Sequence, residues 1–356
     1  MQDVEKVLKP GEQFMVPFLK EMFALPIDGK VPNHKLFMNL ISKTEGFNIE
    51  GCERPVFSPP SRPNTPVTLS TDFEKGQHLD YEKKLEVVEL LGSGRYGKVY
   101  ECRHLEKGFN VAVKIELKED SLKRENEIYF LLGKNNKAAP DFIDFNSNRI
   151  PYYLVISLEG KSFADIFNDW PEEAVGEKEI LSLAYHGLKA FKAIHELRII
   201  HRDVRMENMC LSVTPKKFKV LLIDFGLSTN SWIDKEDGSR CYPTQGNIQF
   251  FKTDYASVRV HEKNAVYELD DLHSFGYLLL DMCRGFEWFD TDEQVDKKKA
   301  LMADVEANVK PSGLFLAPFL KKLFAQQYCK QLPKHDRLMR VIEKTPGFDK
   351  KAYRNC

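Results

Sequence analysis

The pattern of apolar and polar positions divides the chain into a strand-rich part and a helix-rich part. Segments 84–91, 98–105 and 110–117 alternate or cluster β-branched and aromatic residues around a glycine-rich turn, which predicts three strands. Further along, segments 177–197 and 270–283 place apolar residues at the three- and four-residue spacing of helices. The order predicts an α+β fold, with a small strand-rich lobe followed by a larger, mainly helical one.

The helical pattern also occurs a second time, at the start of the chain. Without any gap, residues 1–48 align with residues 302–349 and are identical at 21 of 48 positions. Ordinary composition would give about three identities by chance. We expect residues 1–50 to be a helical segment that repeats the tail of the chain's own domain.

Proline, serine and threonine are dense between the repeat and the first predicted strand. Proline fixes φ and removes a backbone donor, so residues 51–80 are expected to form an extended linker. The main domain is then expected to span residues 81–349.

Composition limits the partners and the cellular setting. The net charge of -1 gives no general attraction to nucleic acid or to anionic membranes. The seven cysteines form no C-x-x-C pair, which favours a reducing interior over a disulfide framework. No apolar run approaches the roughly 18 residues of a membrane span, and the N-terminus lacks the apolar core of a signal peptide. We expect an intracellular monomer, cytoplasmic or nuclear, with no nucleic-acid or membrane partner.

The first candidate site is the glycine-rich turn, with Gly92, Gly94 and Gly97 in G-x-G-x-x-G spacing. Glycines let the backbone approach phosphate oxygens and present N–H donors to them. In dinucleotide-binding folds these glycines open a helix, whereas here a strand follows. The turn therefore favours a flap over a nucleotide.

A lysine and two glutamates follow the turn. Lys114 lies on the third predicted strand, and Glu125 on a following helix offers a carboxylate to hold its ammonium, with Glu127 as the competing candidate. A lysine fixed in this way directs one positive charge at nucleotide phosphates. In isolation, Lys114 is equally well explained as a solvated strand residue.

The segment "IIHRDVRMEN" contributes the strongest chemical pattern. Asp203 is placed to accept a proton from a substrate hydroxyl, while Asn208 and, sixteen residues later, Asp224 offer the oxygen ligands that Mg²⁺ prefers. Each motif alone is common. Their order after the glycine turn and Lys114 predicts ATP-dependent phosphoryl transfer.

This ordered set resembles the eukaryotic protein kinases, and more closely the casein kinase 1 superfamily. The segments "ENEIYFLL", "LEGKSFADIF" and "ELDDLHSFGYLLLDM" are similar to that superfamily's helix C, its post-hinge segment and its helix F. The resemblance implies a bilobed kinase fold, with a small antiparallel N-lobe sheet and helix C at about residues 81–157 and a mainly helical C-lobe at about 158–349. It also implies an ATP- and Mg²⁺-dependent Ser/Thr kinase acting on protein substrates.

The resemblance further assigns roles to single residues. Asp271 would brace the catalytic loop. The remaining assignments concern adenine: Val99 and Ala112 as its contacts, Ile156 as gatekeeper, and Ser157 with Leu158 as the hinge.

Several positions depart from the family pattern and keep a second function open. Arg205 stands where a lysine usually contacts the transferred phosphate, and Met206 stands for a proline. Asn247 replaces a threonine, and Gln249 replaces an arginine that binds primed substrates. The alternative is a pseudokinase or scaffold that binds nucleotide or partners with little catalysis.

Overall fold

The structure is a computed structural model that describes residues 71–350 apart from 81, 83, 95–96, 135, 149, 170–174, 213–217, 234–239, 242–253, 263–264, 288–292 and 330. The first repeat copy, most of the expected linker, Asn247 and Gln249 lie outside the described residues. The elements are, in order, β1 (Leu85–Ser93), β2 (Gly97–His104), β3 (Phe109–Glu116), α4 (Glu119–Leu132), β4 (Phe142–Asn146), β5 (Tyr152–Ser157), α5 (Phe163–Asn168), α6 (Glu177–Glu196), β6 (Ile199–Ile200), η3 (Met206–Asn208), β7 (Met209–Leu211), β8 (Val220–Leu222), η4 (Phe225–Leu227), β9 (Thr229–Asn230), β10 (Trp232–Ile233), β11 (Arg240–Cys241), α7 (Val258–His261), α8 (Glu268–Met282), α9 (Gln294–Ala303), α10 (Val305–Asn308), η6 (Pro311–Leu316), α11 (Ala317–Phe324) and α12 (His335–Lys344).

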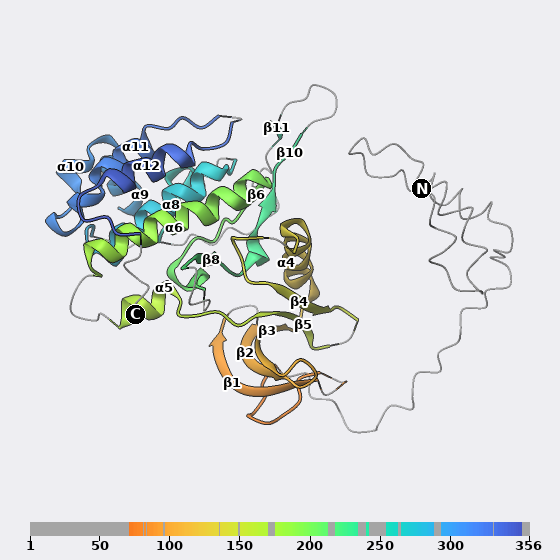
Figure 1. Cartoon of the computed structure of the whole chain (residues 1–356). Coiled ribbons are helices and arrows are strands. Elements are labelled where there is room, and N and C mark those ends of the chain that lie inside the picture. The colour runs from red at the N-terminus through yellow and green to blue at the C-terminus, as the bar shows by residue number, and fades with distance from the viewer. Residues whose placement is uncertain are drawn as a thin grey trace, which may run out of the picture. The chain divides into compact units, whose positions relative to one another are not determined.

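The N-lobe is built on one five-stranded sheet with the order β1-β2-β3-β5-β4 (Figure 1). All of its neighbouring strands pair antiparallel, as expected from the resemblance. Alternate residues such as Val87, Tyr100, Val113 and Val155 point into a common buried cluster. The α+β bilobed prediction is confirmed, and α4 packs beside β5 as the helix C that it requires.

Residues 71–80, which the composition assigns to the linker, pack against this sheet. The Tyr100 hydroxyl donates to the carbonyl of Thr71 at 2.8 Å, and Leu79 joins the buried cluster of the N-lobe. The Asp80 carboxylate accepts the amides of Lys84 and Leu85 at 3.1 and 2.8 Å. The folded domain therefore begins before residue 81, because these polar and apolar anchors tie the segment to β1 and β2.

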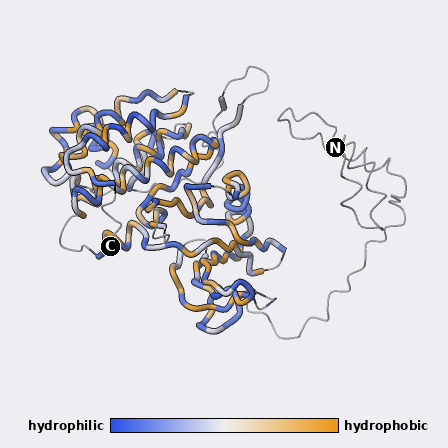
Figure 2. Tube along the Cα trace, viewed as in Figure 1, coloured by the Kyte–Doolittle hydropathy of each residue, from blue (hydrophilic) through white to orange (hydrophobic). Residues whose placement is uncertain are grey.

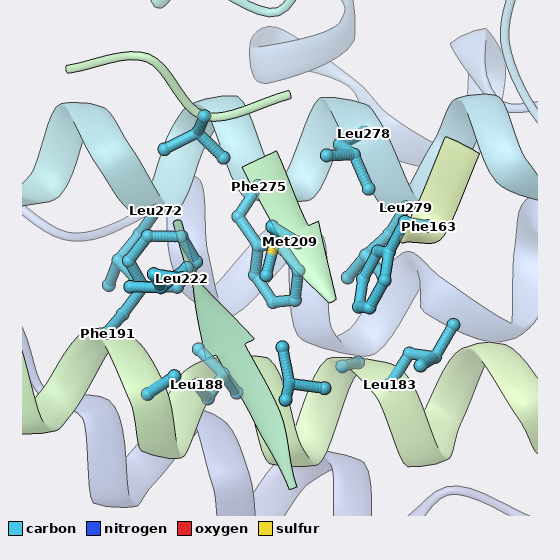
Figure 3. Packing of buried hydrophobic residues seen from close by; sticks show 14 of the residues in the cluster. Phe163, Leu183, Leu188, Phe191, Met209, Leu222, Leu272, Phe275, Leu278 and Leu279 are labelled. Atoms are coloured by element: carbon cyan, nitrogen blue, oxygen red, sulfur yellow. The ribbon is translucent and has the colours of Figure 1, made fainter. Parts of the chain in front are cut away.

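The C-lobe forms around two long helices, α6 and α8, with β7 and β8 between them. Figure 3 shows Phe275 of α8 and Phe191 of α6 pointing into the shared interior, where their ring centroids are 5.2 Å apart. Gly187 makes this close packing feasible, since a Cβ there would lie 2.4 Å from the Phe275 ring. The apolar residues that recur along α6 and along α8 thus face each other in one buried interface.

Residues 302–349 supply α10, η6, α11 and α12, which complete the C-lobe. Phe319, Leu320 and Leu323 of α11 and Ile342 of α12 are fully buried. Figure 2 shows hydrophobic and hydrophilic residues alternating along these helices, as expected for one-sided burial. Within the described part of the chain, no helix has both the length and the apolar character needed to cross a membrane.

Candidate active site

The strand register gathers the predicted nucleotide contacts on one face of the N-lobe sheet. Val99 lies opposite Lys114, and Ala112 lies opposite Ile156. Directly opposed residues point to the same face, as do residues two apart on one strand, so all four side chains share a surface. Leu158 follows the end of β5, where the chain leaves the sheet.

The glycine-rich turn joins β1 to β2. The Gly94 amide donates to the Gly97 carbonyl at 2.9 Å, which closes the turn. A Cβ on Gly97 would lie 1.9 Å from the carbonyl oxygen of Ile115 on β3. Only glycine allows the two strands to approach this closely, whereas Gly92 and Gly94 are exposed and leave backbone available to a ligand.

Lys114 on β3 is surrounded by three carboxylates. Its Nζ lies 2.8 Å from Glu125 Oε2 on α4, 2.8 Å from Asp224 Oδ1 and 3.4 Å from Glu116 Oε1. Glu127, the competing candidate, is exposed on the other side of α4. The helix therefore presents Glu125 to the lysine and Glu127 to solvent.

The charges in this cluster stabilise one another. Burial by itself lowers the pKa of Lys114, but Asp224, Glu125 and Glu116 together raise it well above its ordinary value. Burial also acts to raise the pKa of Asp224, and the Lys114 charge outweighs it and holds that pKa below its ordinary value. Lys114 thus stays a cation and Asp224 an anion.

Asp224 and Phe225 connect the two lobes. Asp224 has the left-handed backbone angles φ 60° and ψ 73°, which turn its carboxylate toward Lys114. The amide of Phe225 donates to Glu125 Oε1 at 3.1 Å. The ring centroid of the buried Phe225 lies 5.7 Å from that of Tyr129 on α4 and 5.1 Å from that of His201. Glu125 consequently holds the lysine with one oxygen and the Asp-Phe-Gly segment with the other.

The catalytic-loop candidates Asp203 and Asn208 contact each other directly. The Asn208 Nδ2 donates to Asp203 Oδ2 at 2.8 Å and to the Asp203 carbonyl at 2.9 Å. Burial raises the pKa of Asp203 to about 6, and the nearby Asp224 charge acts in the same direction. The carboxylate is therefore close to the proton affinity that general-base chemistry near neutral pH requires.

The loop is held from below by Asp271 of α8. Its carboxylate accepts the amide of His201 at 2.7 Å and the amide of Arg202 at 2.9 Å. Arg202 has φ 68°, an angle that a non-glycine residue adopts only when its surroundings impose it. This is the bracing contact that the resemblance implies for Asp271.

Arg205 and Met206, the two departures within the loop, have different environments. Arg205 Nε lies 3.0 Å from Glu207 Oε2, and their side chains are 43% and 56% exposed. Met206 is buried in the C-lobe core. Arg205 thus faces solvent beside Asp203, whereas Met206 has a packing role.

The two metal-ligand candidates have oxygens to offer. Asn208 uses its amide nitrogen for Asp203, and Asp224 uses Oδ1 for Lys114 and the Gly226 amide. Among the residues that the structure describes, Asn208 Oδ1 and Asp224 Oδ2 have no hydrogen-bonding partner. An amide oxygen and a carboxylate oxygen fit the hard-oxygen preference of Mg²⁺.

Sequence reasoning missed Glu116, which is only 1% exposed. Burial raises its pKa, and the Lys114 charge opposes this shift. The available clue was strand alternation, because residue 116 is two positions after Lys114 and must share its face. Lys114 therefore has three carboxylate neighbours, rather than the single one of a lysine–glutamate pair.

Comparisons with known proteins agree with this geometry. Residues 85–336 match the model of the protein kinase domain family. A putative casein kinase I from Caenorhabditis elegans is 25% identical over 278 residues, which cover 74% of this chain and 80% of the relative. The chain therefore belongs to the protein kinase family and is a divergent member similar to casein kinase I.

Proposed function

We propose that this protein is an active kinase that transfers the γ-phosphate of ATP to Ser/Thr hydroxyls of proteins. The observation that carries the proposal is the joining of the two lobes at Lys114, whose Nζ lies 2.8 Å from both Glu125 and Asp224. These partners come from α4 and from the segment before η4, so one ammonium connects three separate parts of the fold. Phosphoryl transfer depends mainly on such positioning and charge neutralisation.

Each catalytic group has a distinct task in the proposal. The ionised Asp203 accepts the proton of the substrate hydroxyl, and Asn208 holds its carboxylate in place. Lys114 directs its charge at the phosphates, and Arg205 adds a positive charge beside Asp203. Asn208 and Asp224 would hold Mg²⁺, which neutralises phosphate charge when bound.

The nucleotide base would lie on the sheet face that carries Lys114. Val99, Ala112 and Ile156 share this face, and Leu158 continues it beyond β5. Their apolar side chains suit a planar base, while Gly92, Gly94 and Gly97 form the turn that would cover the phosphates. The proposal therefore includes ATP in the cleft between the two lobes.

The choice of Ser/Thr over Tyr rests on the similarity to casein kinase I. The positions that bear on primed substrates, Asn247 and Gln249, lie outside the described residues.

The second candidate is a pseudokinase that binds nucleotide with little turnover. It is motivated by Arg205, whose guanidinium pairs with Glu207 rather than with a catalytic group. Against it, all five charged or metal-binding candidates are present: Lys114 contacts Glu125 and Asp224, and Asn208 contacts Asp203. Loss of chemistry usually requires loss of at least one such group.

One assay separates the two candidates. The full chain would be incubated with Mg²⁺ and γ-labelled ATP on a library of Ser, Thr and Tyr peptides, beside an Asp203→Asn variant. Transfer to Ser and Thr by the wild type alone supports the proposal. Background transfer by both proteins contradicts kinase activity, and transfer mainly to Tyr contradicts the Ser/Thr assignment.

An intracellular location, cytoplasmic or nuclear, belongs to the same proposal. Cys102, Cys210 and Cys283 are buried free thiols, and burial raises the pKa of Cys102 and of Cys283 to about 12. Unreactive free thiols are common in reducing compartments. We also expect the protein to act as a monomer.

A further inference from the structure

A buried chain of polar side chains runs from the last helix of the domain to the catalytic loop. Nε2 of His335 at the start of α12 lies 2.9 Å from Nδ1 of His195 on α6. The other nitrogen of that ring, Nε2, lies 3.0 Å from Oδ2 of Asp271 on α8. His335, His195 and Asp271 are 3%, 0% and 1% exposed, so the chain is sealed from solvent.

The Asp271 carboxylate, at one end of this series of hydrogen bonds, fixes the position of the nearest proton. The Asp271 carboxylate accepts the amides of His201 and Arg202, so it serves as an acceptor toward His195 as well. His195 therefore carries a proton on Nε2. One further proton lies between Nδ1 of His195 and Nε2 of His335, and either ring can carry it. Burial and the neighbouring His195 lower the pKa of His335 to about 3, and the Pro333 carbonyl acts in the opposite direction, so the ring of His335 is neutral.

The internal repeat carries a histidine at the same place. The residue that corresponds to His335 in the first copy is also a histidine, His34. The neighbours at 334, 336 and 337 are Lys, Asp and Arg, whereas their counterparts are Asn33, Lys35 and Leu36. The pair His335 and His34 is thus one of the 21 identities of the repeat, as is the nearby pair Pro333 and Pro32.

We propose that His335 is a positioning residue for the catalytic loop. It fixes the ring of His195, which orients the Asp271 carboxylate that holds the two backbone amides immediately before Asp203. The inference rests on the proposed kinase function and extends it, because it gives the repeated tail a role in the alignment of the catalytic base.

The proposal predicts an effect on turnover rather than on nucleotide binding. Without the His335 ring, Nδ1 of His195 loses this buried hydrogen bond, and the ring and the Asp271 carboxylate lose a constraint on their orientation. Asp203 then samples positions away from the substrate hydroxyl. Lys114 and the sheet face that would bind ATP are not part of this chain of contacts.

The kinetic test compares variants of the full chain that differ at α12. We expect His335→Phe to lower kcat about tenfold and to leave KM for MgATP within about twofold. His335→Gln can place an amide group, which offers both a donor and an acceptor, near the position of Nε2, and we expect it to return kcat to within about threefold of the wild type. Equal kcat for His335→Phe and the wild type would overturn the proposal.

Two control variants separate positioning from stability. Asp336→Asn weakens an exposed ion pair with Lys192, in which Nζ and Oδ1 are 2.7 Å apart. This ion pair also joins α6 to α12, but it is not part of the buried series of hydrogen bonds. Leu338→Ala removes buried volume one turn further along α12. Both should leave kcat within about twofold. An equal loss of kcat in Leu338→Ala would show that His335 acts only through the stability of the helix.

Two further readouts do not depend on kinase activity. In the wild type, nitrogen NMR should find His195 protonated at Nε2 and hydrogen-bonded through Nδ1, and an Nδ1 signal of His195 that is unchanged in His335→Phe would overturn the proposal. Amide hydrogen exchange of residues 199–204 should be faster in His335→Phe than in Leu338→Ala. If the wild type transfers no phosphate, the proposed function fails, and these two measurements still decide the role of His335.

Discussion

Two sites in the C-lobe use aspartate carboxylates for different purposes, one for chemistry and one to hold the catalytic loop. In the cleft, Asp203 and Asp224 have few donors around them and lie where the lobes meet. Below the catalytic loop, Asp271 is 1% exposed and accepts two backbone amides and the ring of His195. Burial raises the pKa of Asp203 and of Asp271 alike to about 6, so the number of donors and the position in the fold, rather than residue type, separate a carboxylate available for chemistry from one that holds the fold.

The largest expected effect tests the cleft side of this comparison. Asp224→Asn should lower phosphoryl transfer about a thousandfold, because it removes a charged metal ligand and one partner of Lys114. Lys114 keeps Glu125 and Glu116, so the domain should remain folded. The rate should be measured with Mg²⁺ and ATP beside Asp169→Asn, which alters only an exposed pair with Lys161. Similar rates in both variants would contradict this assignment.

The next prediction tests the role of Asp271 in holding the catalytic loop. Asp271→Asn should lower the free energy of unfolding by about 3 kcal/mol, since an amide group replaces one acceptor that faces buried donors. Urea unfolding of this variant beside Asp224→Asn gives the measurement. The comparison between the clusters fails if Asp224→Asn proves the more destabilising of the two.

The pH dependence sharpens the role of Asp203. Its pKa is raised to about 6, and only the ionised form can accept a proton, so kcat/KM should fall about tenfold per pH unit below that value. Initial rates between pH 5 and pH 8 provide the test, with circular dichroism to show that the fold persists. A flat profile down to pH 5 would exclude Asp203 as the titrating base.

The same raised pKa predicts a smaller effect on stability. A carboxyl with a folded pKa above its ordinary value of 3.8 destabilises the fold at neutral pH, and this penalty begins to shrink as pH falls through about 6 and is lost only near pH 3.8. Asp203→Asn should therefore abolish activity and yet raise the free energy of unfolding by about 1 kcal/mol at pH 7. Urea unfolding at pH 7 and at pH 4.5 checks this, since the difference should shrink at the lower pH. A less stable variant at pH 7 would contradict the prediction.

The smallest effect concerns Arg205. Its guanidinium is partly exposed and pairs with Glu207, so Arg205→Lys should change kcat/KM by about threefold or less and leave stability unchanged. Glu207→Gln serves as the matched control, because it frees the guanidinium and keeps its charge. A loss above a hundredfold in Arg205→Lys would show that the planar fork contacts the transferred phosphate.

Local sequence patterns were sufficient for the elements and for much of the site. Strand alternation in 110–117 and helical periodicity in 270–283 predicted β3 and α8, because each repeat of apolar residues corresponds to one buried face. Motif order brought together Lys114, Asp203 and Asp224 as candidates before their distances were known. The segment 71–80 was different, since its attachment depends on the hydroxyl of Tyr100 far along the chain.

The sequence by itself determined the fold class and the identity of the charged groups, because these follow from periodicity and spacing along the chain. Tertiary structure decided which carboxylates do which work. Glu116 shares a face with Lys114 by strand alternation alone, whereas His335 contacts His195, and through it Asp271, only because α12 packs on α6. Residues 140 positions apart in the chain meet in that contact. Such contacts carry no local pattern, since the free energy that selects them comes from burial and hydrogen bonding in the assembled core.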